Sequence, residues 1–251
     1  MADLYWLSDD EWSRIEPHLP RGRRGAHRVD DRRVISGIVH MLRSGARWRD
    51  CPAEYGPYTT IYNRFNRWSR QGIWYEMFEA LTGSTGMVGT MAIDATHIKA
   101  HRSAAGAKGG PSNAIGRSRG GRTTKIHALT DAVGRPIAFL LTPGNVADIT
   151  AAPQLLANVR PPRRLVADRA YDAASLRRWL ESHGGEAVIP PNPTRKHPHT
   201  YDAQAYKSRN LIERMFCRLK DFRRIATRYD KRIDIFLSAI LLAAAITWWI
   251  N

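Results

Sequence analysis

The chain has 251 residues, of which 43% are hydrophobic and 25% are charged. This composition is typical of a globular protein with a packed core and excludes a disordered, collagen-like or coiled-coil chain, while the length allows one large domain or two modest ones. The 39 Lys and Arg residues against 23 Asp and Glu give a formal net charge of +16, so the expected partner is a polyanion, nucleic acid before an acidic membrane surface.

Three features indicate the compartment. The two cysteines, Cys51 and Cys217, are too few for a disulfide framework and lack zinc-ligand spacing, which predicts free thiols in a reducing compartment. The N-terminus opens with acidic residues and has no signal-peptide pattern. The uncharged stretch 235–250 is shorter than the roughly 20 residues of a membrane-spanning helix, so we expect a buried terminal helix there. A cytoplasmic protein without a membrane partner is predicted.

Residues 1–81 are predicted to be helical. Ser8 precedes three acidic residues, which is typical of a capped helix start. Apolar residues recur at helical spacing over 34–42, and Gly45 ends that run. In the next helix, within 57–72, Ile61, Phe65 and Trp68 face inward, and the other face carries four polar residues, Asn63, Arg64, Asn66 and Arg67. A further helix is expected over 73–81.

Two interpretations fit this helical region. A helix, a turn and a second helix with an Arg and Asn outer face is typical of a helix-turn-helix that enters a major groove. The alternative is a small helical bundle with a solvated Arg face. The basic loop 21–28 and the charge of the chain favour DNA binding. We therefore predict a helix-turn-helix-like DNA-binding domain over 1–81, with contacts from Asn63, Arg64 and Arg67, and a linker over 82–90.

The next region combines a strand with a basic, glycine-rich stretch. Residues 91–93 are apolar and predict a strand that ends in Asp94. From Lys99 to Lys125 there are seven Lys or Arg residues and no acid, a balance that suits a phosphate backbone, although a solvated hairpin loop would have the same composition. The candidate phosphate ligands there are Arg117, Arg119, Arg122 and Lys125.

The remaining elements predict a mixed α/β sheet. Residues 125–130 and 137–141 form a hairpin around the turn DAVGRP. A strand over 165–167 and a helix over 173–183 follow, then a short strand over 186–189 and helical structure from about residue 208. This order indicates a mixed sheet with helices packed against it, and 91–251 is predicted to be the second domain.

Two aspartates follow predicted strands, and a third acid lies on a helix. Asp94 and Asp168 each stand where an apolar strand ends, and ligand sites in open α/β sheets lie beyond the carboxyl ends of strands. Either aspartate alone would more often be a cap or turn residue. At about 100° per residue, a polar face beside the apolar one carries Tyr206, Arg209, Glu213 and Lys220. A solvated ladder of ion pairs is the alternative reading of that face.

These motifs resemble those of bacterial insertion-sequence transposases of the DDE class, in particular the IS-five group. The helical face matches the Tyr-Arg-Glu-Lys signature of that group. AIDATHIKAHR resembles its first-aspartate strand, IGRSRGGRTTKIHALTDAVGRP its basic turn and hairpin, TPGNVADI its following loop and VADRAYDA its second-aspartate motif. WLSDDEWSRIEPHLP and LRSGARWRDCPAEYGPYTTIYNRFNRW resemble its N-terminal helical domain. The resemblance covers essentially the whole chain.

The resemblance implies an RNase H-like catalytic core that cuts and joins DNA with the help of metal ions. Asp94, Asp168 and Glu213 would hold two Mg²⁺ ions, for which Mn²⁺ can substitute, and would cut DNA at terminal inverted repeats. The released 3′-hydroxyl would then attack target DNA. Arg209 and Lys220 would hold phosphate and Tyr206 would contact the terminal nucleotide. Pairing of two element ends implies a homodimer on double-stranded DNA, associated with the nucleoid. His97, His101 and His127 are expected near the site as polar neighbours rather than as metal ligands.

Two other functions remain open from the sequence. An RNase H-like nuclease would hydrolyse DNA without joining strands. A catalytically silent repressor derived from a transposase would only occupy DNA. The presence of all three acids favours an active enzyme over the repressor.

Overall fold

The computed structural model describes residues 3–21, 30–83, 89–105, 113–157 and 159–250. Most of the basic loop 21–28, the middle of the predicted linker 82–90 and part of the glycine-rich stretch 103–121 lie outside the described residues. The chain divides into two compact units. The first comprises Met1–Ser84, His101–Ala107 and Leu219–Asn251, and the second comprises Thr85–Ala100 and Lys108–Arg218.

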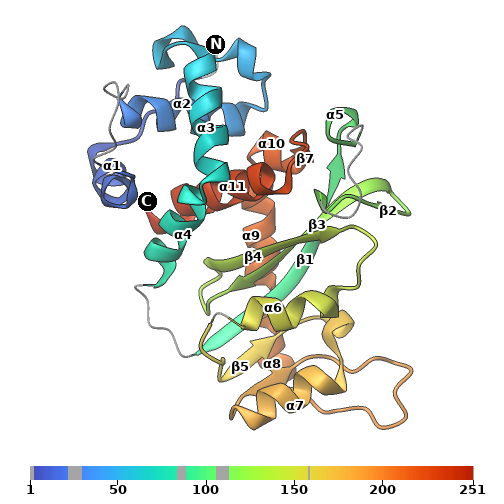
Figure 1. The fold of residues 1–251 in the computed structure, drawn as a ribbon. Helices are drawn as coiled ribbons and strands as arrows, with labels where there is room; N and C mark the ends of the chain where they lie inside the picture. Colours follow the sequence, from blue (N-terminus) through green and yellow to red (C-terminus); the bar gives the residue numbers. More distant parts are fainter. Residues whose placement is uncertain (1–2, 22–29, 84–88, 106–112, 158, 251) are drawn as a thin grey trace. The chain divides into compact units, whose positions relative to one another are not determined.

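The first unit is mainly helical (Figure 1). Its longer helices are α1 (Asp9–Ile15), α2 (Asp31–Ser44), α3 (Tyr58–Arg70), α4 (Ile73–Gly83) and α11 (Ile233–Ala244). Its short elements are the 3-10 helices η1 (Glu16–His18), η2 (Trp48–Asp50) and η3 (Ala53–Tyr55), the helices α5 (Arg102–Ala105) and α10 (Arg223–Ala226), the strand β7 (Thr227–Arg228) and the π-helical η8 (Ala245–Trp249).

Local sequence signals set the ends of the first two long helices. The Ser8 hydroxyl accepts a hydrogen bond from the Glu11 N–H, and the Glu11 carboxylate accepts one from the Ser8 N–H at 2.7 Å, a capping box that satisfies two amides at the start of α1. Gly45 ends α2 with a φ of 72°, a conformation that glycine adopts without steric cost. Both ends agree with the sequence prediction.

The C-terminal helix α11 belongs to this helical unit. Nine of its twelve residues are buried, and it contacts α2, α3 and α4. An apolar helix of this kind needs apolar surface on several sides, and the inward faces of these helices supply it. The compact units therefore differ from the predicted domains, because the segment after residue 218 packs with the N-terminal helices. Within the described ranges, no helix has the length and hydropathy of a membrane span.

The second unit contains a mixed sheet. Its strands are β1 (Thr90–Ala100), β2 (Gly116–Ser118), β3 (Gly121–Thr130), β4 (Pro136–Pro143), β5 (Arg164–Val166) and β6 (Glu186–Val188). They lie in the order β2-β3-β1-β5-β6, and β4 pairs with β3. β1 is antiparallel to β3 and parallel to β5, and β5 is parallel to β6. The predicted β3–β4 hairpin is confirmed, and the Asp131 carboxylate accepts the turn amides of Val133 and Arg135.

β1 is longer than predicted. The apolar run ends at Asp94, but the strand continues to Ala100 because its second half pairs with β3 over the whole register from Ala95↔His127 to Lys99↔Thr123. Pairing with β5, in contrast, stops at Ala92↔Val166. The prediction that the strand ends in Asp94 is therefore wrong for β1 itself, although the parallel part of the sheet does end there.

Helices cover this sheet on more than one side. They are α6 (Ala152–Leu156), α7 (Ala174–Ser182), α8 (Ala203–Tyr206) and α9 (Asn210–Lys220), with the 3-10 helices η5 (Asp148–Ala151), η6 (Arg169–Tyr171) and η7 (Lys207–Arg209). Met91 and Ile93 of β1 share one apolar core with α6 and α7. Since side chains alternate along a strand, Asp94 points to the opposite face of the sheet, where the helical segment 203–220 contributes its polar side chains.

Candidate active site and nucleic-acid interface

The strand register places the two aspartates side by side, where the pairing of β1 with β5 ends. Ala92 and Val166 are the last paired residues of β1 and β5, and Asp94 and Asp168 each follow two positions later. Neighbouring strands lie about 4.8 Å apart, so the two acids are adjacent in space although 74 positions separate them in the sequence. Asp94 Oδ1 accepts a hydrogen bond from the Ala95 N–H, and Asp168 Oδ1 accepts one from the Ala170 N–H, each at 2.8 Å.

Arg209 connects the third acid to this pair. Its Nη2 donates to Asp94 Oδ2 at 2.7 Å, and its Nη1 donates to the carboxylate of Glu213. The Nε–H of Arg209 is buried and has no hydrogen-bond partner among the described residues. The structure thus brings Asp94, Arg209 and Glu213 into one cluster, beside Asp168. Charge-assisted hydrogen bonds of this kind fix the guanidinium plane as well as its position.

The cluster has a mixed electrostatic environment. Burial raises the pKa of Asp94 to about 6, and this rise is opposed by the Arg209 charge and reinforced by Asp168 and Glu213. Glu213 has a side chain that is 52% exposed. No group of three or more His, Cys, Asp or Glu side chains within the described part of the chain is arranged to hold a metal ion. In this arrangement the guanidinium of Arg209 balances the charge of Asp94 and Glu213.

The helical face predicted from Tyr206 to Lys220 is divided into three elements. α8 and η7 end at Tyr206 and Arg209, and α9 continues to Lys220. The backbone stays right-handed helical through the junctions at Lys207 and Asn210. Tyr206 packs edge-on against Tyr201, with ring centroids 5.7 Å apart. Lys220 belongs to the other compact unit, so its phosphate role stays a prediction.

Lys125 is placed differently from the prediction. Its Nζ donates to the Val146 carbonyl and to the Asp148 carboxylate, both at 2.7 Å, and the residue is buried. Its charge is therefore used inside the unit rather than presented to phosphate. The sequence did not indicate this pairing. A buried lysine requires an acid partner, but nothing local in the sequence selects the one 23 positions away.

Tyr171 is a further residue that sequence analysis did not single out. It is fully buried, and its hydroxyl has no hydrogen-bond partner in the described part of the structure. Burial and the neighbouring acids Asp148, Asp94 and Asp168 raise its pKa. The VADRAYDA segment places it three residues after Asp168, within η6, which is the signal that could have marked it as a neighbour of the acids.

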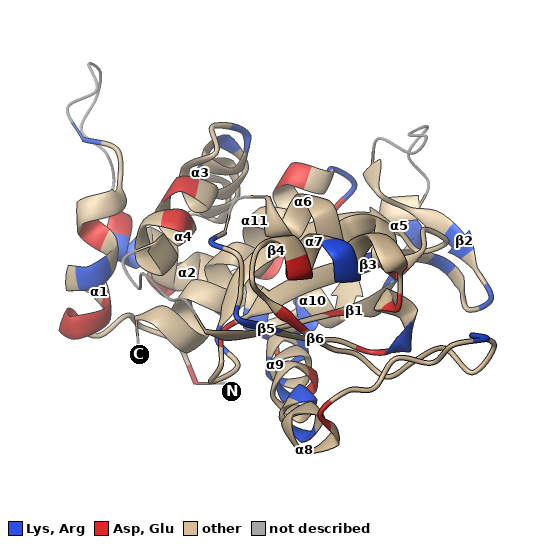
Figure 2. Ribbon diagram, turned by 90° about the horizontal axis from the view of Figure 1, so that it is seen from below, with Lys and Arg blue, Asp and Glu red and all other residues tan. Residues whose placement is uncertain are grey.

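The basic hairpin presents three exposed arginines. Arg117 of β2 lies directly opposite Arg122 at the start of β3, and Arg119 lies in the turn between the strands. Figure 2 shows this concentration of cationic residues along β2. Like charges directly opposite each other in an antiparallel pair are unfavourable. Contact of these three arginines with phosphate stays a prediction.

The predicted DNA-contacting residues of α3 do not share one face. Asn63 and Arg67 are exposed, whereas Arg64 is only 5% exposed and forms an ion pair with Asp31. The guanidinium of Arg64 also lies 5.0 Å from the centre of the Trp68 ring. The predicted contact of Arg64 with DNA is therefore wrong, because this side chain joins α3 to α2. In the sequence Arg64 and Arg67 looked like equivalent DNA contacts, because Asp31, the partner of Arg64, is distant in the sequence.

Two family models match the chain. A model described as a putative transposase of the IS4/5 family matches residues 7–78, and a transposase DDE domain matches residues 89–248. The second match covers more than half of the chain. The chain belongs to the family of DDE transposases, and it is an enzyme of that class.

Individual relatives agree with this assignment. A putative transposase of the insertion sequence element IS6501 from Brucella ovis is 41% identical over 127 residues, which cover 50% of this chain and 98% of the relative. A putative transposase of IS402 from Burkholderia cepacia is 34% identical over 153 residues, which cover 57% and 69% of the two chains. Among solved structures, the piggyBac transposase in a synaptic complex with hairpin DNA aligns with a TM-score of 0.52 and 10% identity over 94% of this chain and 69% of that chain. The fold is mixed α/β and RNase H-like.

Proposed function

We propose that this transposase binds the terminal inverted repeats of its element, cuts DNA there and joins the released 3′-hydroxyl to target DNA. The observation that carries the proposal is the pair of Asp94 and Glu213 that share Arg209, with Asp168 beside Asp94 where β5 ends. Three acids from distant parts of the sequence do not gather at one point for stability, because like charges in proximity disfavour ionisation.

The acids suit a hard divalent cation by their chemistry. Carboxylate oxygens without thiol or imidazole ligands are the donors that Mg²⁺ and Mn²⁺ prefer, and Asp94 and Glu213 already share one cationic group. The donor chemistry of the three acids therefore suits such ions, which would take the place that the Arg209 guanidinium now holds between Asp94 and Glu213. When bound, such ions would activate the attacking hydroxyl and stabilise the leaving oxygen of the phosphodiester.

Arg209 is the residue that we expect to bind phosphate. Its guanidinium carries a buried Nε–H that no described residue accepts, and its two Nη groups are held by carboxylates whose charge a cation could take over. A phosphate oxygen accepts hydrogen bonds from a guanidinium in the same paired geometry as a carboxylate does. Exchange of the acids for phosphate would position the strand to be cut beside Asp94.

Further contacts with the DNA backbone are assigned to the basic hairpin, to Tyr206 and to Lys220. Arg117, Arg119 and Arg122 are exposed and basic, as a sequence-independent phosphate contact requires. Two DNA ends must be held together before joining, so we expect two copies of the chain on paired ends. The synaptic complex of the similar piggyBac transposase contains hairpin DNA, which supports DNA as the partner.

Substitution of each acid tests this function. Asp94→Asn, Asp168→Asn and Glu213→Gln should each lower Mg²⁺-dependent cutting of element-end DNA by at least about a thousandfold, which corresponds to several kcal/mol of lost transition-state stabilisation. Binding of the same DNA, measured in EDTA by fluorescence anisotropy, should remain. Retained cutting by any one variant would remove that acid from the site.

A pre-cut substrate separates the two enzymatic readings. Joining of a pre-cut 3′-hydroxyl end to target DNA identifies a transposase, whereas hydrolysis without joined products identifies a nuclease. DNA binding without either reaction would identify a repressor. Cut and joined products are read on the same gel, with the Asp168→Asn variant as the blank, and binding is measured by fluorescence anisotropy in EDTA.

A further inference from the structure

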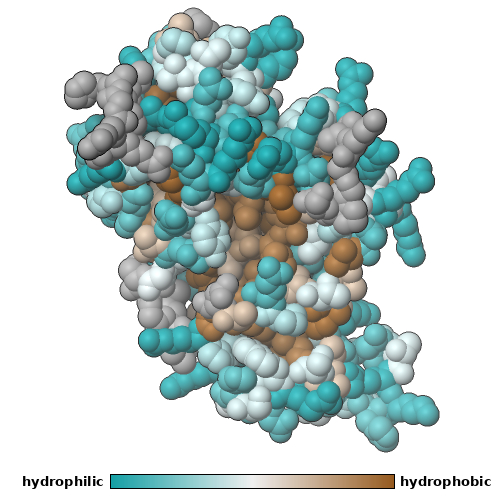
Figure 3. Space-filling view, viewed as in Figure 1, coloured by the Kyte–Doolittle hydropathy of each residue, from teal (hydrophilic) through white to brown (hydrophobic). Residues whose placement is uncertain are grey.

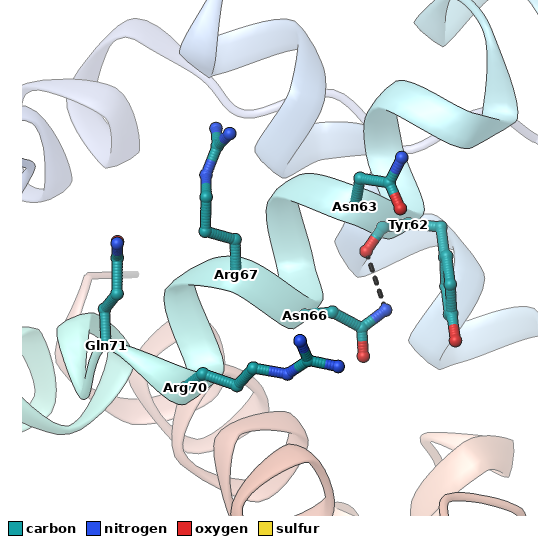
Figure 4. Close-up of a pocket in the computed structure, with 6 residues that line it drawn as sticks. All are labelled: Tyr62, Asn63, Asn66, Arg67, Arg70 and Gln71. Atoms are coloured by element: carbon teal, nitrogen blue, oxygen red, sulfur yellow. Dashed lines mark hydrogen bonds between the residues drawn. The ribbon is translucent and has the colours of Figure 1, made fainter.

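A groove lined mainly by polar residues runs along the exposed side of α3. It has a volume of about 560 Å³ and is lined by Tyr62, Asn63, Asn66, Arg67, Arg70 and Gln71 (Figure 4). The lining side chains come from this one helix and the residue after it. The helix sequence, YTTIYNRFNRWSR, contains no acidic residue. The groove therefore has a positive charge that no acidic residue of α3 balances.

The arginines of α3 divide according to their partners. Arg64 is buried and paired with Asp31, whereas Arg67 and Arg70 are exposed and form no ion pair with any described residue. Figure 4 shows both of these side chains extending from the groove side of the helix. Two guanidiniums that point to solvent without an acid are available to an external anion.

The other lining residues contribute hydrogen-bonding side chains and one aromatic ring to the groove. Asn66 donates its side-chain amide to the Tyr62 carbonyl at 2.9 Å, so this carboxamide shapes the groove. Asn63 and Gln71 are exposed and have no such bond. The Tyr62 ring is 42% exposed and packs against Trp48 with ring centroids 5.6 Å apart. Side chains with this chemistry read bases: carboxamides pair with adenine and guanidiniums with guanine.

We propose that α3 is the helix that reads the DNA sequence, lying in the major groove with Asn63, Arg67, Arg70 and Gln71 at base edges or adjacent phosphates. The proposal rests on the function proposed above and assigns its recognition surface. From Asn63 to Gln71 the helix rises about 12 Å, which corresponds to about four base pairs. The major groove of DNA admits an α-helix, whereas that of duplex RNA is too narrow for side-chain readout, so the partner is double-stranded DNA.

The test uses the full chain in EDTA, so that binding is measured apart from cutting. A preferred site is first selected by the wild type from duplexes with twelve randomised base pairs. Affinity for that duplex is then measured by anisotropy between about 50 and 200 mM salt. The double variant Arg67→Ala, Arg70→Ala should reduce the slope of log affinity against log salt by about 1.8, since each phosphate contact contributes about 0.9.

A control removes one exposed arginine elsewhere, for comparison with Arg67→Ala and Arg70→Ala made singly. Arg178 is exposed on α7 of the other unit, and Arg178→Ala should leave both the slope and the selected sequence unchanged. Asn63→Ala and Gln71→Ala should each lower affinity about 5- to 150-fold for the selected duplex and relax the preference at one or two positions within a four-base-pair block. All four side chains are exposed, so we expect these variants to keep the fold, and circular dichroism checks this.

The outcomes separate this inference from the proposed function. Unchanged slope and unchanged base preference in the α3 variants would overturn the inference, and the function would stand if the same protein still cut DNA with Mg²⁺. Tighter binding of a duplex RNA, or of an acidic peptide, than of any selected DNA would also overturn it. If the wild type selects DNA through α3 but the acid variants still cut, the inference stands and the proposed catalytic site does not.

Discussion

Arginines on two helical segments of this protein have opposite electrostatic surroundings. On α3, Arg67 and Arg70 are exposed and have no acid partner among the described residues. In the other unit, Arg209 donates to both Asp94 and Glu213. The first arrangement leaves positive charge available to a polyanion. The second uses positive charge to stabilise acids that the chemistry of the site requires.

A third class of cation explains why sequence alone could not separate these roles. Arg64 and Lys125 are buried in ion pairs with Asp31 and Asp148. They lie among the basic residues that suggested DNA contacts, yet each stabilises its own unit. We therefore expect the buried, ion-paired cations to contribute to stability and the exposed ones to contribute to DNA affinity.

The largest stability effect is expected on α3. Arg64→Met removes the guanidinium from its ion pair with Asp31, and breaking a largely buried pair by removing one partner costs about 3–5 kcal/mol of unfolding free energy. Arg67→Met, three positions away, should change stability by less than about 0.5 kcal/mol and lower DNA affinity instead. Urea unfolding and anisotropy measure the two quantities. Equal destabilisation by both variants would contradict the division of the α3 arginines.

A somewhat smaller effect is expected at Lys125. Its partner Asp148 retains 24% side-chain exposure, so partial hydration lowers the cost of Lys125→Met to about 3 kcal/mol. The control is Arg117→Met, which should leave the unfolding midpoint nearly unchanged and weaken DNA binding at low salt. If Lys125→Met instead reduced the salt dependence of DNA binding at full stability, this lysine would be a phosphate ligand after all.

The smallest effect concerns pH and His127. Burial lowers the pKa of His127 to about 4, and its ring lies 2.8 Å from the Thr142 hydroxyl. Because the unfolded histidine titrates near 6.5, its contribution to stability is lost as pH falls from 6.5 toward 4, by about 2 kcal/mol between pH 7.5 and 5. The raised pKa of Asp94 acts in the opposite direction, so the wild type must be compared with His127→Gln.

Replacing His127 should make the protein less sensitive to a fall in pH. The unfolding free energy of His127→Gln, relative to the wild type, should rise by about 2 kcal/mol between pH 7.5 and 5, measured by urea unfolding at each pH. A constant difference between the two proteins across this range would show that His127 does not titrate on unfolding.

Much of the second unit could be predicted from the sequence because its signals are local. Apolar runs and the DAVGRP turn indicated β3, β4, β5, β6 and the first half of β1, and the two aspartates marked the place where the pairing of β1 with β5 ends. The long second half of β1 was missed because its residues are only partly apolar and depend on β3 for pairing. The pairing partners of Arg64, Lys125 and Arg209 lie 33, 23 and 115 positions away, a separation at which residue spacing carries no information.

The packing partners of the C-terminal helix could not be predicted either, because they are also distant in the sequence. The hydrophobicity of α11 predicted burial correctly, but not the surface that covers it. Only the contacts with α2, α3 and α4 assign this helix to the N-terminal unit. An apolar helix of this kind has no pattern that distinguishes one apolar neighbour from another.

Binding of Mn²⁺ to the full chain in complex with element-end DNA tests the central claim most directly. Electron paramagnetic resonance counts the free ion as protein is added. We expect the wild type to withdraw up to two ions per chain, Asp94→Asn, Asp168→Asn and Glu213→Gln each to weaken binding at least about tenfold, and the exposed control Asp221→Asn to bind as the wild type does. Equal Mn²⁺ affinity in the wild type and all three acid variants would contradict the account.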